Sequence, residues 1–541
     1  MGSRILAAAL ALAFAATAAT AETPQTPPKL IVAISVDQFS ADLFAQYRQH
    51  FTGGLRRLSE GVAFPSGYQS HAGTETCPGH ATLLTGARPS RSGVIANHWF
   101  NLGAGREDKY VYCAEDERVP GSSSENYTAA PIHLRVPTLG DLMRQRDPRS
   151  RSVAVSGKDR AAIMMGGHNP DRRWWWKGGR FISHAGVAPS PAVTAANARA
   201  TQAIATARSP MPLPPLCAAR SRPVAVGSRT VGDGRFARGG GNLDAFMTSP
   251  EWDEAVLGLA GSMRREMRLG EGPATDILAI GLSATDYVGH QMGTQGSEMC
   301  LQLLALDRML AGFFDQLDRT GIDYVVMLSA DHGGADLPER IREEAGGDAQ
   351  RGDPQLRVRL VSEAIGRRLG LSGPVLHGDS LFGDIYAEPS LSDADRHRVL
   401  DEAISFYRAH PQVAAVFTRA QIEATPSPSG PPDAWPLLQR ARASFDPERS
   451  GDIMVILKPR VVPIPEPRTS VTTHASGWDY DRRVPILFWR RGMAPFEQPL
   501  AVETVDIMPS LAALIDLPIE PGSIDGRCLD LLAGPESSCP Q

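Results

Sequence analysis

The 541-residue sequence has no excess of basic residues, since 55 Lys and Arg stand against 60 Asp and Glu for a formal net charge of −5. A protein that binds nucleic acid normally carries a basic footprint, so the composition argues against a nucleic-acid-binding role. Mild overall acidity does not exclude a small anionic substrate, because bound cations can dominate the charge of a site.

Long apolar runs are scarce. After residue 21, no stretch approaches the roughly 18 consecutive apolar residues that a membrane-spanning helix needs. The first 21 residues combine an early arginine, Arg4, with an apolar run and the ending Ala19-Thr20-Ala21. This pattern predicts a secretory signal peptide at 1–21 rather than a membrane anchor. We therefore expect a mature chain, 22–541, that is periplasmic or secreted, and we separately expect it to be a monomer.

The chain has six cysteines but no CxxC redox pair and no zinc-ribbon spacing. In an exported protein, cysteines are candidates for disulfides. Six cysteines allow fifteen pairings, and the sequence does not choose among them. The pair that we favour is Cys528–Cys539, which would close a short C-terminal loop. No internal repeat is evident.

Short runs of β-branched or apolar residues predict strands at 30–37, 152–157, 276–283, 324–331, 453–458 and 485–490. Runs that are apolar throughout fit strands buried on both faces, as in a parallel sheet covered by helices. Apolar residues at helical spacing predict helices at 297–321 and at 502–517, with Pro509 in the first turn of the latter. The pattern predicts an α/β fold with a mainly parallel central sheet.

Three regions, about 98–150, 165–250 and 340–450, resemble insertions that form caps, loops or small subdomains. The first two are rich in Gly, Pro, Ser and Arg, and the second contains Trp174, Trp175 and Trp176. For these tryptophans we favour buried packing of an inserted loop. A roof over the functional site, or a surface that stacks on aromatic leaving groups, remains the alternative.

Three aspartates, Asp37, Asp286 and Asp331, each follow a predicted strand directly. Ligands of open α/β sheets gather at the carboxyl ends of strands, so we expect these carboxylates to meet. His290 stands four residues after Asp286 and would share a helical face with it. His332 adjoins Asp331, which requires an irregular turn that the glycines at 333–334 would permit.

His474, in the segment TTHASGWDYD, completes a set of three Asp and three His. Divided between two ions, this mixed set of nitrogen and oxygen ligands suits zinc in catalytic sites. Two metal ions a few ångströms apart are suited to displacement at phosphorus. The sequence therefore predicts two Zn²⁺ per chain and a phosphoryl-transfer reaction.

Thr76, in the segment GTETCPGHATLLTG, is the candidate nucleophile. A threonine hydroxyl needs a metal ion or a base to ionise it. Pro78 at the first helical position would start a helix whose N-terminus faces the phosphoryl oxygens. The purely structural alternative for Thr76 is the N-cap of this helix. Thr74 is the other candidate for the nucleophile. For Cys77 we expect a buried or paired cysteine.

The order D…T-x-C-P-G-H-A-T-L…D-x-x-x-H…D-H-G…H resembles the alkaline phosphatase superfamily, with threonine in place of the serine nucleophile. Asn97, twenty-one residues after Thr76, and the K-x-R motif of Lys158 and Arg160 are similar to those of the phosphate-irrepressible bacterial alkaline phosphatases. The resemblance runs from about residue 28 to about residue 532.

The resemblance implies an alkaline-phosphatase-like three-layer sandwich with cap insertions, and hydrolysis of a broad range of phosphate monoesters through a phosphothreonine intermediate. It implies one zinc site formed by Asp37, Thr76, Asp331 and His332, and a second formed by Asp286, His290 and His474. Asn97, Lys158 and Arg160 would bind the non-bridging phosphoryl oxygens.

The alternative within the superfamily is a phosphodiesterase or nucleotide pyrophosphatase. Lys158 and Arg160 favour the monoesterase, because two cations opposite a dianion favour monoesters. A sulfatase is disfavoured because Cys77-Pro78-Gly79-His80 lacks the C-x-P-x-R pattern. An exported zinc-binding protein without activity would be credible only if a ligand or the nucleophile were missing, and none is.

Overall fold

The computed structural model describes residues 26–540. The predicted signal peptide at 1–21 lies outside this range. None of the helices in the described residues is long and apolar enough to cross a membrane.

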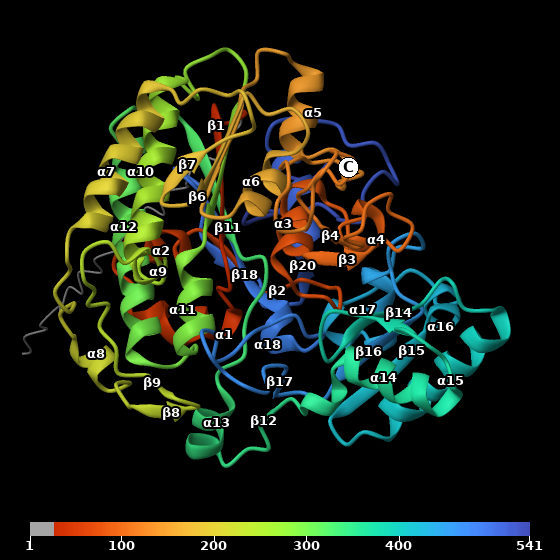
Figure 1. Cartoon of the computed structure of the whole chain (residues 1–541). Coiled ribbons are helices and arrows are strands. Elements are labelled where there is room, and N and C mark those ends of the chain that lie inside the picture. The colour runs from red at the N-terminus through yellow and green to blue at the C-terminus, as the bar shows by residue number, and fades with distance from the viewer. Residues whose placement is uncertain (1–25, 541) are drawn as a thin grey trace, which may run out of the picture.

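A ten-stranded sheet forms the centre of the molecule, in the order β19-β2-β18-β11-β1-β10-β5-β6-β7, with β20 paired to β2 (Figure 1). Its strands are β1 Leu30–Val36, β2 Val62–Tyr68, β5 Ser152–Ser156, β6 Arg172–Lys177, β7 Arg180–Ile182, β10 Asp276–Leu282, β11 Tyr324–Ser329, β18 Arg483–Arg490, β19 Phe496–Glu497 and β20 Val502–Glu503. The five neighbours β11, β1, β10, β5 and β6 run parallel. Strand β18 is antiparallel to both of its neighbours. The mainly parallel sheet is therefore confirmed.

Helices cover both faces of this sheet, as Figure 1 shows. One face carries α1 Ala41–Tyr47, α2 Gly54–Ser59, α7 Pro191–Ala205, α10 Pro250–Glu266 and α12 Ser297–Asp318, and the other carries α3 Thr76–Thr85, α5 Leu139–Arg146, α6 Asp159–Gly166 and α19 Ile507–Ala513. Within β1, Val32 and Ile34 pack into the first core, whereas Ile31 and Ala33 pack into the second. Burial on both faces explains the uninterrupted apolar runs. The three-layer sandwich is confirmed.

A second, four-stranded sheet forms a cap with its own hydrophobic core. Its order is β13-β14-β16-β15, with β13 Leu376–His377, β14 Gly383–Ala387, β15 Val413–Thr418 and β16 Ile453–Leu457, and it packs with α14 Val358–Leu369 and α15 Asp393–Ala409. Placing 453–458 in the central parallel sheet was wrong, because β16 is antiparallel to both of its neighbours here. It is buried on both faces, so its apolar run has the same pattern as a central strand.

Of the two predicted helices, the first is confirmed and the second is only partly helical. The spacing at 297–321 corresponds to α12. Residues 502–517 are not one helix, because Val502 and Glu503 form β20 and the 3-10 turn Thr504–Asp506 follows before α19. Pro509 does lie in the first turn of α19, as expected.

The tryptophan run lies on a core strand rather than on an inserted loop. Trp174, Trp175 and Trp176 form the middle of β6, and all three are buried. Trp176 stacks on Phe246 of α9 Leu243–Met247. Buried packing is confirmed, but β6 and β7 extend the central sheet, so the first part of region 165–250 belongs to the sandwich.

The remaining elements connect or decorate these layers. They are α4 Pro89–Ser92, α8 Pro215–Ala218, α11 Ala284–Met292, α13 Pro338–Ala345, α16 Arg419–Glu423, α17 Leu437–Ser444, α18 Asp479–Arg482, β3 His98–Phe100, β4 Tyr110–Tyr112, β8 Val224–Val226, β9 Arg229–Val231, β12 Gln350–Arg351 and β17 Val461–Val462. The structure also contains the 3-10 turns Arg48–His50, Pro354–Leu356 and Pro432–Ala434.

Three disulfides lie within residues 26–540: Cys77–Cys113, Cys217–Cys300 and Cys528–Cys539. The predicted C-terminal pair is therefore confirmed. Cys77 is paired and fully buried, as expected for the residue next to Thr76.

Candidate metal and phosphate site

The three aspartates meet because three neighbouring parallel strands end together. Strand β1 lies between β10 and β11, in the register that pairs Val36 with Leu282. Asp37 follows β1, Asp286 lies in the first turn of α11 after β10, and Asp331 follows β11. All three are at most 2% exposed. The three carboxylates therefore lie together at the carboxyl edge of the sheet, as predicted.

Three histidines are oriented by their second ring nitrogen. Nδ1 of His290, His332 and His474 donates to the backbone oxygens of Thr472, Gly333 and Thr74, at 2.9, 2.9 and 2.8 Å. A carbonyl oxygen can only accept, so Nδ1 carries the proton and Nε2 presents its lone pair. Metal-ligating histidines are typically fixed in this way.

The Nε2 atoms point at the carboxylates. Nε2 of His332 lies 3.4 Å from both Asp37 Oδ1 and Asp331 Oδ2. Nε2 of His290 lies 3.1 Å, and that of His474 3.6 Å, from Asp286 Oδ1. Among residues 26–540, two groups of ligand atoms are compact enough for a metal ion: Asp37, Asp331 and His332, and Asp286, His332 and His474. The first contains three of the four predicted ligands of one zinc. The second places His332 where the prediction has His290.

The chemistry of this donor set fits metal ions. Asp37 Oδ1, Asp286 Oδ1, Asp331 Oδ2 and His332 Nε2 are buried and have no hydrogen-bond partner among the described residues. Buried polar atoms are normally satisfied, and carboxylate and imidazole donors without partners are what a divalent cation requires. Burial, together with repulsion from Asp286 and Asp331, raises the pKa of Asp37. Bound cations would remove that repulsion.

Lys158 lies between two of the carboxylates. Its Nζ is 2.6 Å from Asp37 Oδ2 and 2.6 Å from Asp286 Oδ2. The lysine reaches this position from the residue that precedes α6. Its ammonium group is therefore held by the carboxylates of two candidate metal ligands.

Thr76 is the first residue of α3 and is buried beside the aspartates. The helix begins two residues earlier than predicted, so Pro78 is its third residue rather than its first. A Cβ at position 79 would lie 2.1 Å from the backbone oxygen of Asp331, so Gly79 permits the close approach of this helix end to the metal ligands. Thr74, the rival nucleophile, donates its hydroxyl to the backbone oxygen of Ser476 at 2.7 Å.

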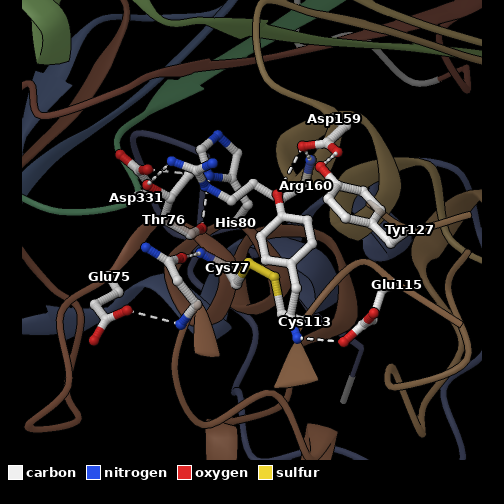
Figure 2. The surroundings of a disulfide bond; sticks show 12 residues. Glu75, Thr76, Cys77, His80, Cys113, Glu115, Tyr127, Asp159, Arg160 and Asp331 are labelled. Atoms are coloured by element: carbon white, nitrogen blue, oxygen red, sulfur yellow. Dashed lines mark hydrogen bonds and ion pairs between the residues drawn. A yellow bond between two sulfur atoms is a disulfide. The ribbon is translucent and has the colours of Figure 1, made fainter. Parts of the chain in front are cut away.

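Arg160 and Asn97 face the start of α3, as Figure 2 shows for Arg160. Arg160 Nη2 lies 3.5 Å from Thr76 Oγ1. Asn97 Oδ1 accepts from the backbone N–H of Cys77 at 2.8 Å, which leaves its amide NH₂ available as a donor. Every predicted site residue therefore belongs to one cluster.

The glycines at 333–334 act differently from the prediction. Neither has a positive φ. Instead, a Cβ on Gly333 would lie 2.2 Å from the backbone oxygen of Tyr480, so the glycine permits close packing rather than an unusual turn.

Sequence reasoning missed Asp159, and it interpreted His80 only as a packing or hydrogen-bonding histidine. Asp159 accepts hydrogen bonds from the hydroxyls of Tyr112 and Tyr127, and His80 Nδ1 lies 2.8 Å from the backbone oxygen of Thr76 and 3.1 Å from Asp331 Oδ2. Only the position of Asp159 inside the K-x-R motif could have pointed to it.

A cleft of about 500 Å³ separates these residues from the cap. Thr76, Asn97 and Arg160 line one wall, and Tyr386 and Met454 of the cap strands line the other. A helix N-terminus carrying a hydroxyl, facing clustered Asp, His, Lys and Arg at the carboxyl edge of an α/β sheet, defines the class of metal-dependent phosphoryl-transfer enzymes.

The comparison with protein families makes this class specific. The chain belongs to the type I phosphodiesterase / nucleotide pyrophosphatase family, whose model matches residues 31–479. It is 58% identical over 518 residues to alkaline phosphatase PhoK of a Sphingomonas species, covering 95% of this chain and 93% of the relative. It is 45% identical to alkaline phosphatase PhoD of Zymomonas mobilis, covering 95% and 89%.

Solved structures agree on the fold. The crystal structure of alkaline phosphatase PafA matches with a TM-score of 0.80 at 25% identity, over 94% of this chain and 99% of that one. Murine ectonucleotide pyrophosphatase / phosphodiesterase 5 shares the fold at a TM-score of 0.53 and 12% identity, over 91% of this chain and 96% of that one.

Proposed function

We propose that this chain is an exported, zinc-dependent alkaline phosphatase that hydrolyses a broad range of phosphate monoesters through a phosphothreonine on Thr76. The observation that carries the proposal is the guanidinium of Arg160, 3.5 Å from the Thr76 hydroxyl. A cation at that position faces the oxygens of a phosphoryl group that the hydroxyl attacks. PhoK and PhoD, both named alkaline phosphatases, support the reaction class.

Two zinc ions are the cofactors that the donor set supports. Asp37, Thr76, Asp331 and His332 would bind one, and Asp286, His290 and His474 the other. Bound there, zinc would lower the pKa of a hydroxyl group and neutralise charge on the leaving oxygen. The buried donor atoms without partners, and the three oriented histidines, support this assignment.

The remaining steps belong to the chain's own residues. The Thr76 oxygen attacks phosphorus, the bond to the leaving oxygen breaks, and the phosphoryl group is transferred to Thr76. Asn97, Lys158 and Arg160 bind the non-bridging oxygens and hold the phosphoryl group in line. Water then attacks the phosphothreonine from the side that the alcohol has left, which releases phosphate and restores the threonine.

Export and domain organisation complete the proposal. Residues 1–21 act as the signal peptide, and 22–541 forms one monomeric catalytic domain in the periplasm or outside the cell. The three disulfides favour an oxidising compartment.

The description of the family favours a second candidate, a phosphodiesterase or nucleotide pyrophosphatase. Arg160 beside Thr76 and Lys158 beside Asp37 and Asp286 argue against it. A diester has one charge and one free oxygen fewer than a monoester, so it gains less from Lys158 and Arg160.

To decide between the phosphatase and the phosphodiesterase, kcat/KM is measured with zinc-loaded protein for an aryl phosphate monoester and for the matching diester, and the ratio of the two is taken. We expect a ratio far above one. A ratio below one would replace the phosphatase with the diesterase.

A further inference from the structure

The hairpin of β3 and β4 has its open end at the active site. Asn97 directly precedes β3 and Cys113 directly follows β4, and the N–H of Cys113 donates to the backbone oxygen of Asn97 at 2.9 Å. His98 pairs with Tyr112 in the adjacent register position. One end of a short hairpin thus places Asn97 and Tyr112 side by side.

This open end is attached to the nucleophile segment three times, by a disulfide and by two hydrogen bonds at Asn97, one of which runs from the Asn97 N–H to Glu75 Oε2 at 2.7 Å. The disulfide joins Cys113 to Cys77, the residue after Thr76 (Figure 2). The N–H of Cys77 also donates to Asn97 Oδ1 at 2.8 Å. Both cysteines are fully buried in a small core that includes Trp99. Strands of three residues form a marginal hairpin on their own, so its position depends on these attachments.

The same hairpin reaches the start of α6. The Tyr112 hydroxyl donates to Asp159 Oδ1 at 2.7 Å, and the Tyr127 hydroxyl donates to Asp159 Oδ2 at 2.6 Å. Asp159 also accepts from the backbone N–H of Arg160 at 2.7 Å. Both carboxylate oxygens are therefore occupied, and the guanidinium of Arg160 remains directed at Thr76, as Figure 2 shows.

A buried ion pair anchors the end of β4. Glu115 is fully buried, accepts from the backbone N–H of Tyr112 at 2.8 Å, and binds both terminal nitrogens of Arg106 at 2.6 and 2.8 Å. The orientation of Tyr112 is thus fixed from its backbone as well as from its hydroxyl.

We propose that the Cys77–Cys113 disulfide and the Tyr112–Asp159–Tyr127 bridge act as one positioning device, which sets Asn97 and Arg160 relative to Thr76. The inference rests on the proposed function, because it assigns the device to recognition of the phosphate dianion. Residues of three separate segments must meet within hydrogen-bond distance of one small group. A misplacement of about 1 Å in such a site can cost about 100-fold in rate.

The other two disulfides provide matched controls. Cys217–Cys300 is also fully buried but joins α8 to α12 on the opposite face of the sheet. Cys528–Cys539 closes a loop near the C-terminus. Neither touches the residues that face Thr76, so their removal tests stability alone.

The test compares Cys77→Ala/Cys113→Ala with Cys217→Ala/Cys300→Ala in the zinc-loaded full chain. We expect the first variant to lose about 10- to 100-fold in kcat/KM for an aryl monoester. For the matching diester it should lose less than about threefold. It should also bind inorganic phosphate more weakly, in proportion to the loss for the monoester. The control should melt at a lower temperature than the wild type but keep the wild-type affinity for phosphate and the wild-type ratio of monoester to diester kcat/KM. Equal ratios in both variants would overturn the proposal.

Tyr112→Phe covers the case in which the cysteine variant does not fold. It removes one hydroxyl, and we expect a roughly 3- to 10-fold loss of monoester kcat/KM with weaker inhibition by phosphate. Tyr407→Phe, which removes a buried hydroxyl bonded to the Leu356 oxygen in the cap, is the control and should keep the ratio.

The ratio of monoester to diester kcat/KM in the wild-type protein distinguishes failure of the proposed function from failure of the positioning device. A wild-type ratio below one contradicts the proposed function. A wild-type ratio above one that Tyr112→Phe leaves unchanged contradicts the positioning device alone.

Discussion

The two halves of the proposed site, one for metal ions and one for phosphate, are held by different kinds of structure. In the metal-ligand half, Asp37, Asp286 and Asp331 follow three adjacent parallel strands in the middle of the central sheet. In the phosphate-binding half, Asn97 borders a hairpin of two three-residue strands and Arg160 lies in the first turn of α6.

The difference shows what each half needs for precision. Backbone hydrogen bonds along the sheet fix the strand ends, so the aspartates require no further attachment. The hairpin has few such bonds, and a disulfide and a bridge of tyrosines take their place. The metal half should therefore tolerate changes to cross-links that the phosphate half does not.

The most damaging change removes the proposed nucleophile, which both halves share. Thr76→Ala should lower kcat by about 10⁴-fold or more for both ester classes, while the metal content, measured by atomic emission, remains close to that of the wild type. Thr74→Ala is the matched control and should lose less than about tenfold. Near-normal turnover by Thr76→Ala would contradict the assignment of Thr76 as the nucleophile.

Disrupting the phosphate half alone should separate the two ester classes. Lys158→Ala/Arg160→Ala should lose about 1000-fold in kcat/KM for a monoester, since each charge-assisted hydrogen bond contributes about 1.5–3 kcal/mol. Diester hydrolysis should fall about tenfold. Metal content must be measured in parallel, because Lys158 contacts Asp37 and Asp286. Equal losses for the two esters would contradict the role of these cations.

Disrupting the metal half alone should lower both ester classes together. His474→Ala should reduce the bound zinc and depress monoester and diester hydrolysis alike by about 100-fold or more. His410→Ala, which removes a histidine that follows α15 in the cap and packs on Phe406, serves as the control. A selective loss of monoester activity would show that the halves are not separable in this way.

The smallest effect concerns pH. Burial and the neighbouring Asp159 raise the pKa of Tyr112 and Tyr127 above the usual value near 10. Their contribution to stability is complete below about pH 10 and is lost as the pH rises further, because the unfolded chain releases these protons first.

Thermal unfolding of wild type and Tyr112→Phe at several pH values checks this contribution. Above about pH 10, wild type should lose up to about 1.4 kcal/mol per pH unit more than the variant. Parallel stability curves would show that Tyr112 ionises without cost to the fold. Between about pH 7 and pH 10, where the monoester is a dianion, the monoester-to-diester ratio of kcat/KM for the wild type should stay constant.

Local patterns predicted much of the fold and the composition of the site. Strands β1, β10 and β11 were recognisable as apolar runs, and each is followed by a carboxylate. The spacing of Asp286 and His290 indicated a helical turn, which is α11. These features are encoded within a few residues, so a single segment is enough to reveal them.

Long-range arrangement was not predictable in the same way. The apolar run of β16 resembles that of a central strand because Ile453 and Val455 pack into one core and Met454 and Ile456 into another. Periodicity reports burial on both faces but not the sheet to which a strand belongs. Region 165–250 begins with β6, which pairs with β5 across the intervening helix α6, and the polar and glycine-containing residues that flank β6 in the sequence do not indicate this pairing.

By itself, the sequence determined which side chains are present for the chemistry: three Asp, three His, a threonine beside a helix start, and an Asn with a Lys-x-Arg pair. Only the tertiary structure decided that Cys77 pairs with Cys113 and that Tyr112 reaches Asp159. The physical reason is that residue type and spacing follow from local backbone geometry, whereas these contacts depend on where separate segments come to rest around a common core.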